Sequence, residues 1–314
     1  MLKKAVNECR LTLTIHSKSP LLIKEGRYEQ PESKGKMPDS FFVCRNTPSE
    51  IKTAVEKDDY SKIRFYLPGS SLRGVIRSHA EKIARTLIPE EPICCIPHNG
   101  TACKGGYKNS CVICKLFGSK EAGGRIHIYD SETQRKGKVI ERYGNAIDRF
   151  TGGVSRGLLF KNKLLKEYIF TSQIIIRNFE IWQLGLLAYV LRDFNVFSGN
   201  DKPGLITVGF GKNRGFGRVK GSIGDVWITY FDRDLGRDCY ELMGMGEIEY
   251  KSSKLYGFVT GDPLSGGLLV EAIIDAEAPY RKQCKVKDNL EFFKACADVW
   301  NKVVNDRKFS SVSK

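Results

Sequence analysis

The sequence predicts an α+β protein whose core follows a ferredoxin-like order of strand, helix, strand, strand, helix and strand, interrupted by long insertions. Three observations predict this class. Apolar and polar residues alternate from Cys9 to His16, which is the period of a half-buried strand. Apolar residues recur at helical spacing over 72–87 and again over 179–194, and β-rich segments follow both helices. The 314 residues, 41% of them hydrophobic, suffice to bury a sizeable core.

The first part of the chain combines a strand, a long loop and a helix. The strand ends before Ser19-Pro20, and residues 24–62 are polar and punctuated by Pro, Ser and Gly, which indicates a long loop. A turn over 67–71 precedes the first helix, for which Ser70 or Ser71 is the expected N-cap. The apolar face of this helix comprises Leu72, Val75, Ile76, His79, Ile83 and Leu87.

Two insertions separate the later core elements. Residues 94–117 contain a cysteine cluster, and 131–160 is a basic, glycine-rich stretch in which we expect a hairpin. The remaining core strands are expected at Arg125 to Tyr129, Phe170 to Ile176 and Val219 to Tyr230.

The chain after Asp232 is more acidic and predicts strands at 255–259 and 268–274. The tail presents Phe293, Ala297, Trp300 and Val304 on one helical face, which we expect to pack on its own domain rather than on a partner. We therefore divide the chain into a domain over 1–232 and a C-terminal extension over 233–314 of unassigned role.

The chain carries 51 Lys and Arg against 36 Asp and Glu, a formal charge of 51 − 36 = +15. This surplus favours nucleic acid as the partner, because cations placed near phosphates release condensed counterions. No apolar stretch approaches the roughly 18–20 residues of a membrane helix, and the strand-like N-terminus does not have the pattern of a signal peptide. We expect a soluble, cytoplasmic protein with no membrane contact.

Five of the ten cysteines lie within 94–114. Cys111 and Cys114 have the C-x2-C spacing that lets two thiolates share one metal ion, and Cys103 lies eight residues earlier. Spacing does not decide whether Cys94, Cys95 or His98 completes the set, although we favour Cys95. A site closed by four protein ligands would hold a structural zinc ion that folds the loop and does not activate water.

A glycine-rich stretch over 208–219 alternates glycines with cations and aromatic residues. Glycines let backbone N–H groups approach phosphate oxygens, and Lys212, Arg214 and Arg218 would supply positive charge. The stretch is not a Walker loop, because no Gly-Lys-Ser/Thr ends it; the alternative is a plain hairpin between strands. The helix start over 67–77 is a second candidate anion site, through its dipole and free N–H groups.

Four segments, in this order along the chain, resemble motifs of the RAMP superfamily of CRISPR-associated proteins. More narrowly, they resemble the backbone subunits of type III effector complexes, and the resemblance extends over about residues 10–230. The segments are LPGSSLRG (67–74), CVICKLFG (111–118), AIDRFTGG (146–153) and GFGKNRGFGRV (209–219).

The resemblance implies a modified RNA-recognition-motif-like core in the domain over 1–232, with a zinc-binding insertion near 94–117 and a thumb hairpin near 131–162. The implied partners are a guide RNA, a complementary target RNA, other subunits of the complex and further copies of the chain. The implied RNA-contacting residues are Ser70, Ser71, Arg73, Arg77, Asp148, Arg149, Lys212, Arg214 and Arg218.

Family members that cut target RNA use an aspartate in the long loop after the first strand, which corresponds here to Asp39. A carboxylate at that place can hold Mg or Mn, or orient a ribose 2′-hydroxyl for attack on its neighbouring phosphate. Asp58 and Asp59 compete for the role. The resemblance thus implies a metal-dependent endoribonuclease within a ribonucleoprotein complex.

Two alternatives remain at this point. The chain could be a non-catalytic, structural backbone subunit, or an endoribonuclease that processes repeat RNA with a histidine base. We favour neither, and none of His16, His79, His98 and His127 lies where such a base is expected.

Overall fold

In the computed structural model, which describes residues 4–24, 38–87, 94–95, 103–231, 241–261, 263–265, 267, 269–273 and 280–306, an eight-stranded sheet forms the centre of the molecule. The strand order is β11-β12-β8-β1-β7-β4-β2, and β3 also pairs with β7, beside β4. All these pairs are antiparallel. The strands are β1 (Asn7–Ser17), β2 (Tyr66–Leu67), β3 (Ile126–Ile128), β4 (Ser131–Arg135), β7 (Ile169–Arg177), β8 (Val219–Phe231), β11 (Val270–Ile273) and β12 (Arg281–Val286).

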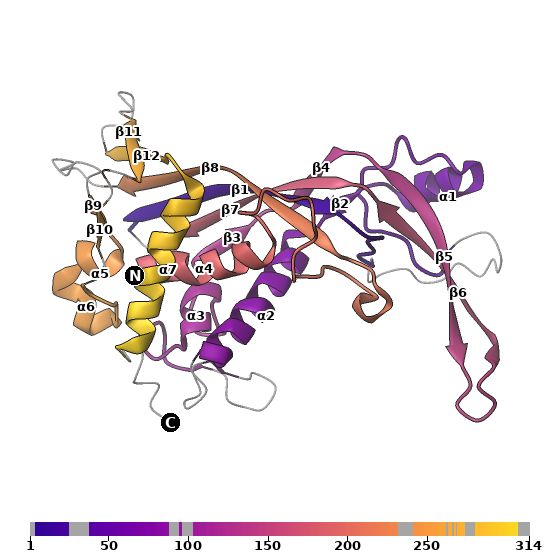
Figure 1. Ribbon diagram of the computed structural model, residues 1–314, viewed down its shortest axis with the longest axis horizontal. Helices are drawn as coiled ribbons and strands as arrows, with labels where there is room; N and C mark the ends of the chain where they lie inside the picture. Colours follow the sequence, from indigo (N-terminus) through magenta and orange to yellow (C-terminus); the bar gives the residue numbers. More distant parts are fainter. Residues whose placement is uncertain are drawn as a thin grey trace.

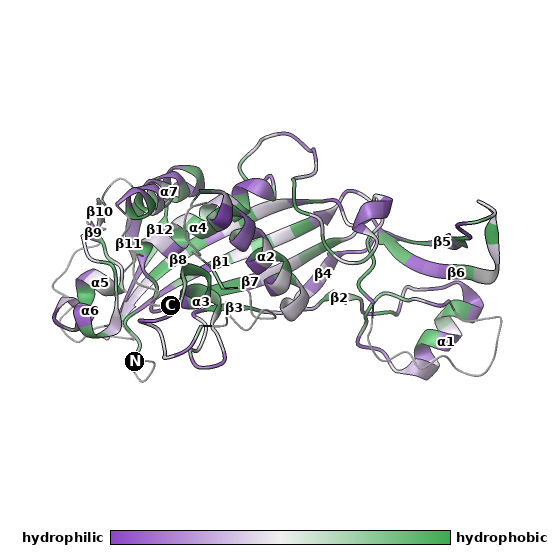
Figure 2. Cartoon of the chain, turned by 90° about the horizontal axis from the view of Figure 1, so that it is seen from below, coloured by the Kyte–Doolittle hydropathy of each residue, from purple (hydrophilic) through white to green (hydrophobic). Residues whose placement is uncertain are grey.

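Helices pack against one face of this sheet (Figure 2). They are α2 (Gly69–Leu87), α3 (Val112–Phe117), α4 (Ile181–Asp193) and α7 (Asn289–Asn305). The alternation in β1 explains the arrangement, because Leu11, Leu13 and Ile15 are fully buried while Arg10 is exposed. The main core therefore lies between the sheet and its helices.

A two-stranded hairpin, β5 (Lys138–Ile147) with β6 (Val154–Lys166), projects from one end of the molecule (Figure 1). Helix α1 (Pro48–Lys57) lies at the same end. At the opposite end lie α5 (Met245–Ile248) and α6 (Tyr250–Tyr256), next to the small sheet of β9 (Glu241–Leu242) and β10 (Leu264–Ser265).

The C-terminal segments share the central core. Strand β12 pairs with β8, and α7 packs on α4 with the rings of Trp182 and Trp300 5.9 Å apart. The close approach needs Gly185, since a Cβ there would lie 2.1 Å from the carbonyl oxygen of Cys296. The prediction that the tail helix packs on its own domain is confirmed, and the core extends across the predicted division at residue 232.

The strands predicted at 9–16, 125–129, 170–176 and 219–230 coincide with β1, β3, β7 and β8, and the two predicted core helices are α2 and α4. The prediction of one long loop over 24–62 is wrong in part, because residues 48–57 form α1. Residues 25–37 of that loop lie outside the described chain. The α1 start is fixed by Pro48 and by Glu50, whose carboxylate accepts from the Thr47 N–H at 2.8 Å. Only Ile51 and Ala54 are buried in α1, so the segment lacks the apolar repeat from which a helix is predicted.

Two further expectations were wrong. Helix α2 begins at Gly69, so neither Ser70 nor Ser71 is its N-cap; the carboxylate of Asp130 accepts from the Gly69 N–H at 2.9 Å. The segment 255–259 is not a strand, because α6 includes Leu255 and is capped by Gly257 in the left-handed conformation. In addition, β4 joins the central sheet, so the projecting hairpin starts at Lys138.

Candidate metal centre and nucleic-acid interface

Four thiols meet beside the start of α3. The Sγ atoms of Cys95, Cys103, Cys111 and Cys114 all lie within 4.8 Å of one another, and three of these cysteines are buried. Cys111 is the N-cap of α3, where its sulfur accepts from the Cys114 N–H, so the helix start sets the C-x2-C pair. The structure thus brings together the four cysteines that the sequence singled out.

The spacing of these sulfurs fits a tetrahedral metal ion. Cys95 Sγ lies 3.5 Å from Cys114 Sγ and 3.9 Å from Cys111 Sγ. Zinc–sulfur bonds of about 2.3 Å would separate tetrahedral sulfurs by about 3.8 Å. Hydrogen bonds from the Cys114 thiol and N–H lower the pKa of Cys111, whereas the same contact raises the pKa of Cys114, so the pair favours one thiolate.

The sequence left Cys94 and His98 as the other candidates for the fourth ligand. Cys94 Sγ lies 4.0 Å from the carbonyl oxygen of Glu81, and Cys94 is not in the cluster. His98 lies outside the described residues. The buried four-cysteine cluster is therefore consistent with a structural zinc site.

Two arginines of α2 connect this cluster to the helix. Arg77 donates to the carbonyl of Gly118 at 3.2 Å, to Cys114 Sγ at 3.7 Å and to Glu81 at 3.1 Å. Arg73 donates to the carbonyl of Phe117. Both guanidinium groups are thus oriented by the segment that follows the cysteine pair.

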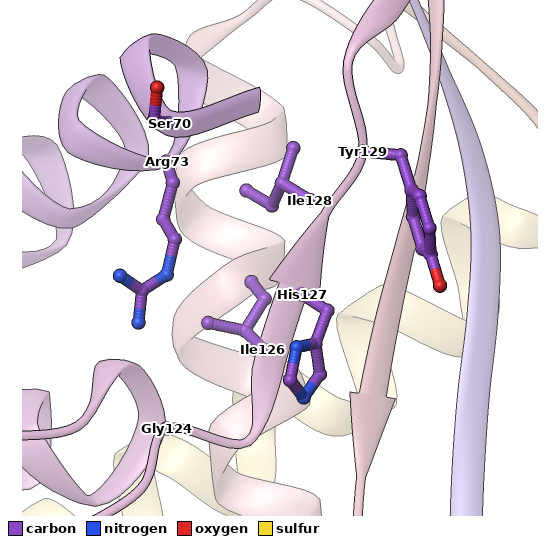
Figure 3. A pocket seen from close by; sticks show the side chains of 7 residues that line it. All are labelled: Ser70, Arg73, Gly124, Ile126, His127, Ile128 and Tyr129. Carbon is purple, nitrogen blue, oxygen red and sulfur yellow. The ribbon is translucent and has the colours of Figure 1, made fainter. Parts of the chain in front are cut away.

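A cavity of about 450 Å³ opens between the start of α2 and β3. Its lining residues are Ser70, Arg73, Gly124, Ile126, His127, Ile128 and Tyr129. Ile126 and Ile128 point toward α2, whereas His127 and Tyr129 point to the other side of β3 (Figure 3). A Cβ on Gly124 would lie 2.9 Å from the Arg73 guanidinium, so glycine at this position gives the arginine room. Ser70 and Arg73 therefore share one cavity, while Arg77 is turned toward the cysteines.

The glycine-rich stretch is a tight loop on the surface. Gly209, Gly211, Gly215 and Gly217 all have φ between 74° and 84°, which side chains rarely adopt, and a short 3-10 helix covers Lys212–Arg214. Lys212 and Arg214 are exposed. The Phe210 ring is 39% exposed, and Lys24 Nζ lies 3.9 Å from its centroid. The loop therefore presents cations and one ring to solvent.

This loop reaches a segment of the projecting hairpin that we name the hairpin root, residues 141–144 of β5 and 160–163 of β6. A Cβ on Gly144 of β5 would lie 3.1 Å from the Arg214 guanidinium, and Gly144 pairs with Phe160 of β6. The next residue of β6, Lys161, donates its N–H to the carboxylate of Asp39 at 2.6 Å. Asp39 is exposed, so its carboxylate is held at the hairpin root with access to solvent.

A charged cluster lies at the same root. Lys163 Nζ contacts Asp58 at 3.1 Å and Glu141 at 3.2 Å, and Glu141 also pairs with Lys161 at 3.1 Å. A hydrogen bond from Tyr143 lowers the pKa of Glu141 to about 2, with the two lysines adding to the effect. Asp58 is thus paired with a lysine, whereas the Asp59 carboxylate accepts from the Ser61 N–H at 2.9 Å.

Sequence reasoning missed Glu141, Lys161 and Lys163. Lys161 and Lys163 are two residues apart on a strand and share a face, which an alternating pattern over 138–166 could have revealed. Their carboxylate partners come from other segments of the chain and leave no local signal.

The hairpin tip contains two further predicted RNA contacts, Asp148 and Arg149. Asp148 accepts from the N–H groups of Phe150 and Thr151 at 2.9 and 2.8 Å, and these bonds lower its pKa. Asp148 therefore closes the turn, while Arg149 is exposed and Phe150 is fully exposed.

Two histidines are engaged in structural contacts. His79 Nε2 lies 2.7 Å from the carboxylate of Asp193, which joins α2 to α4. His16 Nε2 lies 3.2 Å from the Ser222 hydroxyl across the β1–β8 pair.

Comparison with known families gives a match over residues 14–220 to the family model described as the RAMP superfamily. The matched range includes β3, β7, the hairpin and the glycine-rich loop, together with the end of β1 and the first two residues of β8. No curated protein matches the chain. Among the described helices, none has both the length and the apolar character needed to cross a membrane.

Proposed function

Since the chain belongs to the RAMP superfamily, we propose that it is an RNA-binding backbone subunit of a type III CRISPR effector complex. Guide RNA would be its first partner, and target RNA, other subunits and further copies would assemble around it. The spatial order β8-β1-β7-β3, antiparallel throughout, supports a ferredoxin-like core beneath the insertions.

The convergence of three segments carries this proposal. The glycine-rich loop, the hairpin root and the Asp39 segment lie together, although they are far apart in sequence. The exposed Lys212 and Arg214 suit a phosphate backbone, and the glycine backbone of the loop allows close approach. Ser70 and Arg73 at the cavity beside α2 would extend the contact, with Arg149 of the hairpin as a further cation.

We also propose that zinc occupies the four-cysteine cluster. All four positions of a tetrahedron are supplied by sulfur, so the ion would serve folding and leave no open position for water. Its role for RNA would be indirect, through the carbonyl groups of Phe117 and Gly118 that orient Arg73 and Arg77.

For cleavage of target RNA, we propose Asp39 as the catalytic carboxylate. Mg or Mn ions in proteins are commonly held by one or two carboxylates together with substrate phosphates, which suits a single exposed aspartate. Such an ion would neutralise charge on the phosphate. The Lys161 N–H fixes one carboxylate oxygen, which leaves the other free to orient or deprotonate a ribose 2′-hydroxyl.

The test uses the assembled complex with guide RNA, labelled complementary RNA and Mg²⁺. Asp39→Asn retains an oxygen for the Lys161 N–H, so the loop should stay in place while cutting falls about 100-fold or more. Glu56→Gln, on the exposed face of α1, is the matched control and should cut normally.

Three results would count against parts of the proposal. Normal cutting by Asp39→Asn, with loss in Asp58→Asn or Asp59→Asn, would move the role to those residues. A wild type that binds guide RNA and never cuts would identify a structural subunit. Metal-independent cutting of free repeat RNA would instead favour a processing enzyme.

A further inference from the structure

The face of the central sheet opposite the helices carries one continuous row of side chains. The register pairs Lys285 of β12 with Trp227 of β8, Trp227 with Arg10 of β1, Arg10 with Ile175 of β7, and Ile175 with His127 of β3. Four inter-strand steps of about 4.8 Å make this row about 19 Å long. We name these five residues the sheet row.

Apart from the buried Ile175, the sheet row combines rings and cations that remain accessible. The side chain of Arg10 is 47% exposed and that of Lys285 38%, and Lys285 Nζ lies 5.7 Å from the Trp227 ring centroid. The Trp227 ring is half-buried and His127 is exposed. A half-buried indole flanked by two cations is a platform on which an unpaired base can stack while its phosphates face positive charge.

The surroundings of the row favour a polyanion over an apolar partner. Across the sheet this face bears the cations Arg10, Arg135, Arg177, Lys220, Arg281 and Lys285 against the carboxylates Glu8, Glu132, Asp225 and Glu271. Glu8 is buried and holds Arg10 and Arg177, at 2.9 and 3.0 Å, so it fixes their direction. Neutral hydroxyl and amide groups fill the neighbouring positions, which are Thr12, Thr14, Thr171, Gln173 and Ser222.

The row also leads directly to residues already assigned to RNA. His127, at its end, lines the same cavity as Ser70 and Arg73 (Figure 3). Tyr129, which is 51% exposed, follows on the same side of β3 and lines the cavity as well. A strand lying along the row would therefore reach the cavity beside the start of α2.

We propose that this open sheet face is a second RNA-binding surface, which holds two or three unpaired nucleotides of single-stranded RNA with one base stacked on Trp227. The size agrees with four-stranded sheets that stack two or three bases. The proposal goes beyond the proposed guide contacts and uses only Ser70 and Arg73 among them, for continuity at the cavity.

The chain contains a built-in reporter for this surface. Of its three tryptophans, Trp182 and Trp300 are fully buried against each other, which leaves Trp227 as the one that a ligand can reach. Titrating the full-length, zinc-loaded protein with a single-stranded oligouridylate should quench tryptophan emission. The matching RNA duplex should not quench it, because its bases are already stacked.

Variants separate stacking from general RNA binding. Trp227→Phe should keep the affinity, measured by anisotropy of labelled RNA, and lose the quenching. Trp227→Ala should weaken binding of the single strand about five-fold or more. Tyr250→Ala, an exposed ring on α6, is the matched control and should bind as wild type does.

The outcomes distinguish this inference from the proposed guide contacts. Lys212→Gln with Arg214→Gln should weaken RNA binding yet leave the quenching at saturation intact. RNA binding without quenching, or unchanged affinity in Trp227→Ala, would overturn the second surface and leave the guide contacts standing. If other protein subunits quench the emission and RNA does not, the face is a protein interface, and the second RNA-binding surface is overturned too. No RNA binding at all would overturn both.

Discussion

Arg73 and Arg77 differ in what their side chains contact, although they lie one turn apart on α2. Arg77 is engaged with Gly118, Glu81 and the Cys114 sulfur, whereas Arg73 lines the cavity beside β3. The sequence predicted an RNA contact for both arginines, because it shows only their charge and their position on the helix. The carbonyl groups that select their directions come from a segment about 40 residues away.

At the residue scale, the sharpest prediction concerns Lys212 and Arg214. Replacing both by Gln should remove two phosphate contacts and flatten the dependence of log affinity on log salt by about 1.4 for single-stranded RNA. Affinity measured over a series of KCl concentrations gives this slope. Lys251→Gln, an exposed cation on α6, is the control. If the salt dependence of the double variant equals that of the wild type, the loop is a structural hairpin and does not contact phosphates.

At the element scale, the short helix α3 depends on its N-terminal cysteine pair. It has six residues, too few to be stable alone, and all six are buried. A metal ion bound to Cys111 and Cys114 would fix its first turn, and the carbonyls after it orient Arg73 and Arg77. The cysteine cluster and the start of α2 are thus physically linked.

Cys111→Ser should therefore abolish zinc binding and weaken RNA binding together. Elemental analysis should give close to one zinc per wild-type chain and much less in the variant. Cys94→Ser is the matched control, because Cys94 lies close in sequence to the ligands but outside the four-cysteine cluster. This variant should retain zinc, since the Cys94 sulfur contacts the Glu81 carbonyl instead. Wild-type protein with less than about half an equivalent of zinc would contradict the site.

Elements with a strong repeating pattern were predictable, and those without one were not. The alternation in β1 and the apolar face of α2 gave nearly correct bounds. Helix α1 was missed because it buries only two residues, and 255–259 was misread because its apolar content resembles a strand. Spacing pointed to three of the four cysteines and left the fourth open among Cys94, Cys95 and His98. The charged cluster at the hairpin root was not predictable, because Asp58, Glu141 and Lys163 meet only after folding.

At the scale of the whole molecule, the C-terminal extension is part of the structural core. Trp300 of α7 is fully buried against Trp182 of α4, although about 120 residues separate them in sequence. Sequence patterns could assign α7 an apolar face but not the helix it would pack on.

Trp300→Ala should consequently destabilise the entire protein by about 3–5 kcal/mol. Denaturant unfolding of the zinc-loaded protein measures this change in the free energy of unfolding. Asp298→Ala, on the exposed side of the same helix, should change it by less than about 0.5 kcal/mol. Equal stability of the two variants would mean that α7 is an appendage, not part of the core.

The sheet ends in short strands on both sides. Its outermost members are β11, with four residues, and β2, with two, whereas the long β8 is covered by β12. Unpaired strand edges are templates for joining one chain to another, and short edges offer few hydrogen bonds for it. A second copy of the chain would therefore find few edge hydrogen bonds with which to continue this sheet.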